Sequence, residues 1–219
     1  KKSLMSCEVL SQKNTRACRG QVAPGATRCR NHGGPNFVKD DTFFDVCKRR
    51  DSVTALKMIV DESFDFASVN KMHNTPLICA IEYEMYDVAL ALVKTGKSNP
   101  GAINIFGYTA LLLLSYRTVI PVRELVLELI KTGESRPNYA PMHYPSAFDN
   151  FCQYSDTVPF LKEMIKVKDF DPLTRDNYDN IPITIACQYR CYEVVSDLLK
   201  ITGCSIVYRG MPLYEWCLL

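Results

Sequence analysis

Four side chains near the start of the chain have the types and spacing to bind one metal ion: Cys7, Cys18, Cys29 and His32. Three thiolates and one imidazole satisfy the tetrahedral coordination of zinc, and Cys29 and His32 form a close ligand pair of the kind that zinc sites use. A turn at Pro24-Gly25 lets the chain double back so that two of the sulfurs reach the same ion. Because four protein ligands leave no open position for water, the predicted zinc is structural rather than catalytic.

The segment that carries these ligands needs a cross-link to fold. Residues 1–36 contain four Gly, two Pro and little aliphatic material. A polar segment this short cannot bury enough apolar area to offset the entropy lost on ordering it. The sequence therefore predicts a small zinc-stabilised module over residues 1–36, and the alternative interpretation is three unrelated thiols on a disordered arm.

The same residues resemble a known class of zinc module. The matching segments are Thr15-Arg16-Ala17-Cys18-Arg19-Gly20, Pro24-Gly25 and Cys29-Arg30-Asn31-His32-Gly33-Gly34. They are similar to the three-Cys-one-His modules of phage, bacterial and giant-virus proteins. The resemblance covers residues 7–34 and departs from the pattern in the first arm, which lacks the Gly that usually precedes the second Cys.

Positive charge is concentrated in the same part of the chain. Residues 1–40 carry eight Lys or Arg against two acids, whereas the remaining 179 residues carry 18 bases and 22 acids. Clustered bases give affinity for phosphates without sequence preference, so nucleic-acid binding through residues 1–36 is one hypothesis. The alternative is that the arginines are solvated or balance the charge of the thiolates, and the segment has no aromatic residue before Phe37 for base stacking. The arginines concerned are Arg16, Arg19, Arg28 and Arg30.

The overall composition is that of an ordinary folded protein. Of the 219 residues, 47% are hydrophobic and 23% are charged, and the net charge is +2, which excludes wholesale disorder and a collagen-like repeat. No apolar run approaches the ~20 residues of a membrane helix, and no secretory signal is visible, although the absence of an initial Met indicates a start further upstream. Seven of the ten cysteines lie outside the basic segment, some of them in apolar runs. Buried free thiols in an intracellular protein are the favoured interpretation, rather than a disulfide framework.

Three sets of markers recur along residues 37–219. Asn74-Thr75-Pro76-Leu77 returns in related form at Tyr108-Thr109-Ala110-Leu111 and at Asn180-Ile181-Pro182-Ile183, with a copy expected near Ser146-Ala147-Phe148. The other two sets are Lys94-Thr95-Gly96, Lys131-Thr132-Gly133 and Ile201-Thr202-Gly203, and Pro100, Pro137 and Pro172. The spacings lie near 35 residues, or near twice that value, in all three sets. A period of this length is typical of repeat proteins.

Each repeat has the pattern of two short helices. Met85, Val88, Ala89 and Leu92 are apolar at helical spacing before Gly96, which can end a helix, and the segments Glu124 to Gly133 and Glu193 to Gly203 repeat this pattern. We therefore expect an all-α fold with about six helix-turn-helix units. The first unit is degenerate enough to serve as a cap, and the last, beginning near Met211-Pro212, ends after one helix at Leu219.

A unit of about 33 residues with a turn and two helices resembles the ankyrin repeat. In the second unit, Thr75-Pro76-Leu77, Ala80, Asp87-Val88 and Leu92-Val93 match that family's pattern. The chain departs from the pattern between the helices, where Glu84 and Arg190 replace the usual Gly. The resemblance covers about residues 40–219 and implies an α-solenoid. Divergent repeats of this kind are typical of large-DNA-virus proteins, so the resemblance also indicates a viral source.

The resemblance implies where a protein partner would bind. Ankyrin arrays bind proteins along a concave face formed by the turn tips and the first helix of each repeat. The tips are expected at Lys71-Met72, Ile105-Phe106 and Asn177-Tyr178, where Met72 and Phe106 are apolar at positions that should be wet. The alternative is that each packs on the neighbouring tip. The tyrosines Tyr83, Tyr86, Tyr116, Tyr189 and Tyr192 are interpreted as packing residues at the solvent edge.

No catalytic motif is present, and the only His residues outside the basic segment are His73, expected in an exposed turn, and His143. The favoured hypothesis is a non-catalytic protein-interaction scaffold, intracellular and viral, with structural zinc, no small-molecule substrate and no membrane span. One alternative is a nucleic-acid-associated protein that uses the zinc module. Another is a structural component of a virion, suggested by the apolar end Trp216-Cys217-Leu218-Leu219.

Overall fold

Helix starts in this protein are marked by short polar side chains that cap free backbone N–H groups. The computed structural model describes residues 42–117, 119–142, 144–202, 207–208 and 211–212. The Oγ atoms of Thr75 and Thr109 accept from backbone N–H groups three residues later, at 3.4 and 3.1 Å, and helices α3 (Pro76–Glu82) and α5 (Ala110–Ser115) follow. Such caps stabilise a helix by about 1 kcal/mol each.

The expected fourth copy of this start is confirmed at Ser146. Its Oγ accepts from Asp149 N at 3.2 Å, while the Asp149 carboxylate accepts from Ser146 N at 2.8 Å, a reciprocal pair that opens α7 (Ala147–Cys152). Helix α9 (Pro182–Gln188) has Ile181 in the capping position, which has no polar side-chain atom. There the Thr184 hydroxyl accepts from Ile181 N at 3.1 Å instead.

The described part of residues 43–219 contains ten α-helices, so the all-α prediction is confirmed for this part of the chain. The first helices of the pairs are α1 (Phe43–Lys48), α3, α5, α7 and α9. The second helices are α2 (Ser52–Ile59), α4 (Tyr86–Lys94), α6 (Val119–Lys131), α8 (Val158–Met164) and α10 (Tyr192–Thr202), with a short 3-10 helix η2 (Ser155–Thr157) before α8. The chain divides into two units, 1–42 and 43–219, and these ten helices belong to the second.

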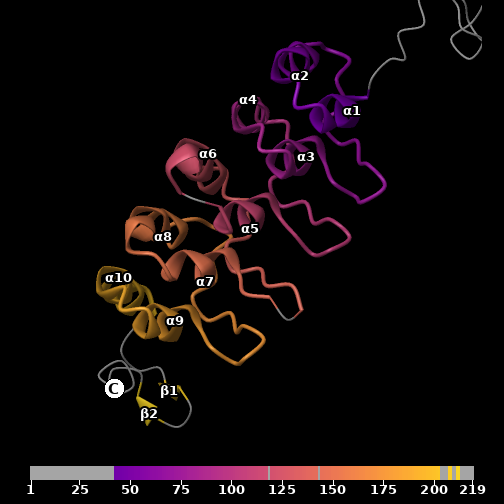
Figure 1. The fold of residues 1–219 in the computed structure, drawn as a ribbon. Helices are drawn as coiled ribbons and strands as arrows, with labels where there is room; N and C mark the ends of the chain where they lie inside the picture. Colours follow the sequence, from indigo (N-terminus) through magenta and orange to yellow (C-terminus); the bar gives the residue numbers. More distant parts are fainter. Residues whose placement is uncertain (1–41, 118, 143, 203–206, 209–210, 213–219) are drawn as a thin grey trace, which may run out of the picture. The chain divides into compact units, whose positions relative to one another are not determined.

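The helices form two layers. Each first helix packs on its own second helix and on the first helix of the next pair, and the second helices pack on one another in the same order. Figure 1 shows α1, α3, α5, α7 and α9 in one row and α2, α4, α6, α8 and α10 in the other, with long loops projecting beside the first row. One continuous core runs between the rows, and its largest fully buried side chains include Phe148, Phe151 and Phe160.

The loops repeat a local hydrogen-bond pattern that holds their tips in shape. Asn70 Oδ1 accepts from the backbone N–H groups two and four residues later, at 2.8 and 3.0 Å. Asn104 and Asp176 do the same in their own loops, with distances between 2.7 and 3.0 Å. Asn and Asp favour this kind of turn because their short side chains reach their own backbone.

Several turns place non-glycine residues in the left-handed region of backbone conformation. Glu84 (φ 61°) and Arg190 (φ 60°) do so between the two helices of a pair, and His73 (φ 55°) does so at a loop tip, whereas the equivalent loop position after α4 is Gly107 (φ 82°). For residues with a Cβ this conformation costs roughly 1–2 kcal/mol. Glu84, Arg190 and His73 therefore adopt the backbone conformation that glycine favours, at a cost in strain.

This strain predicts opposite effects at two exposed turns. Arg190→Gly is expected to raise the free energy of unfolding by up to about 1 kcal/mol, because glycine relieves the strain but also gains freedom in the unfolded chain. Gly133→Ala should lower it by about 1 kcal/mol, since Gly133 has φ 68° and nothing within 4 Å of an added Cβ, so only the backbone term changes. Urea denaturation followed by circular dichroism measures both. Equal signs for the two variants would contradict the explanation.

The structure describes five helix pairs rather than six units. Where the sixth unit was expected to begin, Val207–Tyr208 (β1) and Met211–Pro212 (β2) form a two-residue antiparallel pair, so Pro212 lies in a strand and not at the start of a helix. The remainder of that unit, residues 213–219, lies outside the described residues.

Candidate partner-binding surface

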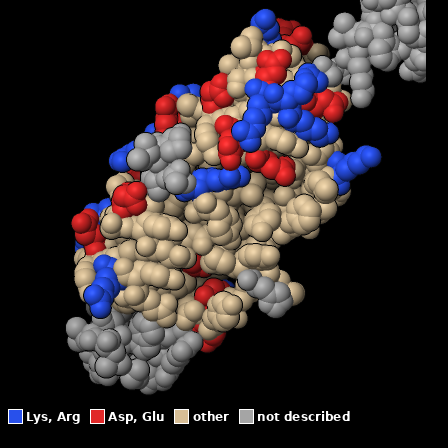
Figure 2. Space-filling model, in the orientation of Figure 1, with Lys and Arg blue, Asp and Glu red and all other residues tan. Residues whose placement is uncertain are grey.

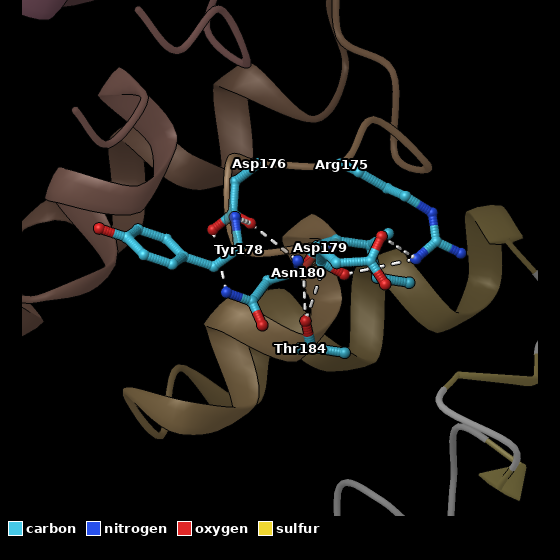
Figure 3. Close-up of polar contacts among 7 residues, drawn as sticks. Arg175, Asp176, Tyr178, Asp179, Asn180 and Thr184 are labelled. Carbon is cyan, nitrogen blue, oxygen red and sulfur yellow. Dashed lines mark hydrogen bonds and ion pairs between the residues drawn. The ribbon is translucent and has the colours of Figure 1, made fainter. Parts of the chain in front are cut away.

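The loop tips carry exposed side chains at one position per repeat. Lys71, Met72, Ile105 and Asn177 are all exposed. Phe106 is 56% exposed and Tyr178 is 70% exposed. Figure 3 shows the Tyr178 ring pointing away from the hydrogen-bonded loop. The alternative that Met72 and Phe106 each pack on the neighbouring tip stays open beside the binding interpretation.

Hydrogen bonds between neighbouring loops fix the tips relative to one another. Ile105 N donates to Met72 O at 3.1 Å, and the buried Asn104 Nδ2 donates to Asn74 Oδ1 at 2.9 Å. Further along, Asn177 Nδ2 donates to Pro141 O at 3.0 Å. The Asn177 amide thus joins two loops, which gives it a structural task beside any contact with a partner. These bonds make a row of tips that is ordered before a partner arrives, and such preorganisation lowers the entropic cost of binding.

Two tip residues were missed by the sequence analysis. Met142 is 75% exposed, and Tyr144 is exposed beside it in the loop before α7. Tyr144 packs edge-to-face on Tyr108, with ring centroids 5.9 Å apart. The signal was present in the sequence, because two apolar residues in a polar loop at the expected tip spacing are unusual. The fourth repeat keeps so little of the family pattern that its tip was not assigned.

The tyrosines predicted to pack at the solvent edge divide into two groups. Tyr83 and Tyr86 are half-buried against the core, as expected. Tyr116 is exposed and packs edge-to-face on Tyr108, as expected, with ring centroids 6.3 Å apart, whereas Tyr189 and Tyr192 are exposed and their packing stays a prediction. Tyr116 and Tyr189 directly follow α5 and α9, and Tyr192 begins α10.

Charged side chains of both signs surround the turns between the helices of the first three pairs. The Glu84 carboxylate contacts Arg50 Nη1 at 3.6 Å and Arg117 Nη1 at 2.9 Å, so three consecutive pairs share one ion-pair row. Figure 2 shows this mixed region toward the α1–α4 end and a larger uncharged area toward the other end of the same face. Exposed ion pairs contribute about 0–1 kcal/mol each, so their effect is on register more than on stability.

The polar side chains at the base of the last two loops line a small hollow. Its volume is ≈ 10 Å³, far below the ~300–1,000 Å³ of small-molecule sites. Asp149 and Asp176 both face it, and Asp176 Oδ2 accepts from Asn180 Nδ2 at 3.0 Å (Figure 3). Burial raises the pKa of Asp149, and the nearby Asp176 carboxylate adds to this effect, while the hydrogen bonds from Ser146 act in the opposite direction.

The raised pKa of Asp149 predicts a pH dependence of stability. As the pH rises above the unfolded value of about 3.9, the unfolded chain releases this proton before the folded chain does. Stability is therefore lost through that window and stays lower above the folded pKa. Asp149→Asn keeps an acceptor for Ser146 N but has no charge. The free energy of unfolding of this variant, relative to that of the natural chain, should therefore increase as the pH rises from the unfolded to the folded pKa of Asp149. Urea denaturation at a series of pH values measures this difference.

The control for this prediction has the opposite sign. Hydrogen bonds from Ser63 lower the pKa of the exposed Asp61. The ionised Asp61 carboxylate therefore stabilises the folded chain above its unfolded pKa, and this stabilisation is lost as the pH falls through its folded pKa. Asp61→Asn should therefore remove stability at neutral pH and none in strong acid. A gain that is independent of pH in Asp149→Asn would contradict the assignment of the shift to burial.

Several sequence predictions concern residues outside the described part of the chain. These are the zinc ligands Cys7, Cys18, Cys29 and His32 and the arginines Arg16, Arg19, Arg28 and Arg30, all of which stay predictions. Among the residues that the structure describes, no group of three or more His, Cys, Asp or Glu side chains could hold a metal ion. His73 lies exposed in a turn, as predicted, and His143 is outside the described residues.

The expected free thiols are confirmed for four of the five cysteines that the structure describes. Cys47, Cys79, Cys152 and Cys191 are free and buried. Cys187 is disulfide-bonded, so for this residue the expectation is wrong.

Comparison with models of known protein families gives no match, and comparison with curated proteins gives none either. Within the described residues, every helix is too short or too polar to cross a bilayer.

Proposed function

We propose that this chain is a non-catalytic protein-binding scaffold of the ankyrin-repeat type, whose partner contacts the row of loop tips. The observation that carries the proposal is the exposure of Met72, Phe106, Met142 and Tyr178 at one tip after another. Hydrogen bonds hold the loops that present them. Exposed aromatic and Met side chains on a preorganised support have the composition of interface anchors. The ankyrin assignment is supported by the period of the sequence markers and by the two rows of packed helices.

The spacing of the tips favours one kind of partner segment. Packed helices lie about 8–10 Å apart, so successive tips are separated by a similar distance. A polyproline II segment rises about 3.1 Å per residue with three residues per turn. A partner segment in this conformation would therefore place every third side chain on one face and at the next tip, and apolar residues at that interval would fit the anchors.

A peptide-display selection tests this proposal. Residues 37–219 are immobilised and used to select from a random library, and the dissociation constants of the selected peptides are then measured by calorimetry. Phe106→Ala is expected to weaken binding about 30-fold, which corresponds to the ~2 kcal/mol typical of an anchor residue.

The matched control is Val60→Ala, because Val60 is 81% exposed but follows α2, away from the tips. This variant should bind within twofold of the natural chain. Selected peptides that bind both variants equally well, or that lose affinity only with Val60→Ala, would overturn the assignment of the surface to the tips.

A further inference from the structure

The four buried free thiols lie in two pairs, and each pair joins neighbouring helix pairs. Cys47 of α1 lies close enough to Cys79 of α3 to shift its pKa, and Cys152 of α7 does the same for Cys191, which directly precedes α10. Helix α1 packs on α3, and α7 packs on α9, so each thiol pair bridges an interface of the array. Neither pair has a part in the proposed tip surface.

In the pair formed by Cys152 and Cys191, one thiol also contacts the backbone. Cys191 Sγ lies 3.3 Å from the carbonyl oxygen of Cys152, 39 residues earlier in the chain. Cys152 is 2% exposed and Cys191 is 6% exposed. Two thiols and one carbonyl group therefore lie together where the fourth and fifth helix pairs meet, and Cys191 is the more exposed of the two residues.

The two thiols of this pair differ in how readily they ionise. Burial raises the pKa of Cys152, with its hydrogen bond to Cys191 adding to the effect. The same hydrogen bond lowers the pKa of Cys191 to about 7. An attacking thiol reacts fastest when its pKa lies near the ambient pH. At Cys79 the hydrogen bond with Cys47 and burial both raise the pKa, which keeps that thiol protonated.

We propose that Cys152 and Cys191 form a peroxide-responsive dithiol that closes to a disulfide and links the fourth helix pair to the fifth. The Cys191 thiolate attacks one oxygen of a peroxide, which forms an S–O bond and breaks the O–O bond. The Cys152 sulfur then attacks the sulfenic sulfur, the S–S bond forms, and water leaves. In total, two thiols and one hydrogen peroxide give one disulfide and two waters, so the sulfurs are oxidised and the peroxide is reduced.

Cys47 and Cys79 provide the internal control. They also lie on consecutive helix pairs, on the first helices α1 and α3, and both are fully buried. We expect this pair to remain reduced at a peroxide dose that closes the other pair.

Trypsin separates all four residues, which makes the test direct. Cleavage after Lys and Arg places Cys47, Cys79, Cys152 and Cys191 in four different peptides, and cleavage after Arg190 separates Cys191 from Cys187. The full chain is treated with hydrogen peroxide, denatured in the presence of N-ethylmaleimide, digested and analysed by mass spectrometry. The expected result is a linked pair of peptides containing Cys152 and Cys191, with Cys47 and Cys79 fully alkylated.

Two variants complete the experiment. In Cys191→Ser, a hydroxyl can still donate to the Cys152 carbonyl, so the fold is retained and Cys152 should be alkylated in full after peroxide. In Cys152→Ala, Cys191 should stop at the sulfenic acid, which dimedone traps. The proposal is overturned if Cys152 and Cys191 remain alkylated when peroxide has oxidised an equal concentration of glutathione, if Cys191 links to Cys187 instead, or if Cys47 and Cys79 close first.

Discussion

Replacing Phe151 by Ala is expected to lower the free energy of unfolding by about 3–5 kcal/mol. The Phe151 ring is 1% exposed and meets Phe160 edge-to-face at 5.5 Å between centroids, which joins α7 to α8. Removing it leaves a cavity at the centre of the fourth helix pair. Neighbouring rings belong to short helices that are fixed on both sides, so collapse into the cavity is limited.

The same substitution should also change the shape of the unfolding transition. In repeat arrays, stability is close to a sum of contributions from single units and from their interfaces. Weakening the fourth pair separates the fifth from the first three, so urea denaturation followed by circular dichroism should show a second, earlier transition. Phe106→Ala is the matched control, since that ring lies at an exposed tip and its loss should change stability by less than about 0.5 kcal/mol. One transition at an unchanged midpoint would contradict the central role of the fourth pair.

Elemental analysis of the purified full chain is expected to find one zinc ion per chain, absent from a Cys18→Ser, Cys29→Ser variant. Binding of a structural zinc contributes about 10–16 kcal/mol at pH 7, so the loss of two of four ligands should release the metal completely. Because the ligands must be deprotonated, zinc should also be released in acid.

A control variant and a second observable make the zinc prediction specific. Cys47→Ala, Cys79→Ala removes two thiols from the helical array and should leave the zinc content unchanged. The helical circular dichroism of the ligand variant should stay close to that of the natural chain, since the ten described helices lie in residues 43–202 and contain none of the zinc ligands. Absence of zinc from a reduced preparation made without chelators would reject the module, and residues 1–36 would then be a basic arm.

The helices of the array were predictable where local chemistry determines them. Thr75, Thr109 and Ser146 are capping residues at spacings of 34 and 37 residues, and Gly96 and Gly133 have the positive φ that the end of a helix uses. The sixth unit was not predictable in this way. A Pro such as Pro212 suits the first turn of a helix and also the edge of a strand, so local sequence does not decide between them.

The positions of the loop tips were predictable from the sequence, but the exposure of single side chains was not. Tip positions follow from the repeat, because Asn70, Asn104 and Asp176 each stand five residues before a helix-capping position. The exposure of a side chain does not follow from its position in the repeat. Tyr86 and Tyr192 begin equivalent helices, but only Tyr192 is exposed. The pairing of Cys152 with Cys191 depends on how two helix pairs pack, and no local pattern records contacts over 39 residues.

The order in which the helix pairs pack also determines how the molecule would respond to a mechanical load. Each pair rests on the pairs next to it in the chain, and polar contacts such as Lys94 to Glu124 and Lys162 to Glu193 run from one pair to the following one. Thr75 and Thr109, which begin successive pairs, are 34 residues apart. A pair that yields under tension would replace a layer about 10 Å thick by roughly 110 Å of extended chain. Residues 43–202 are therefore expected to lengthen in steps under tension, one helix pair at a time.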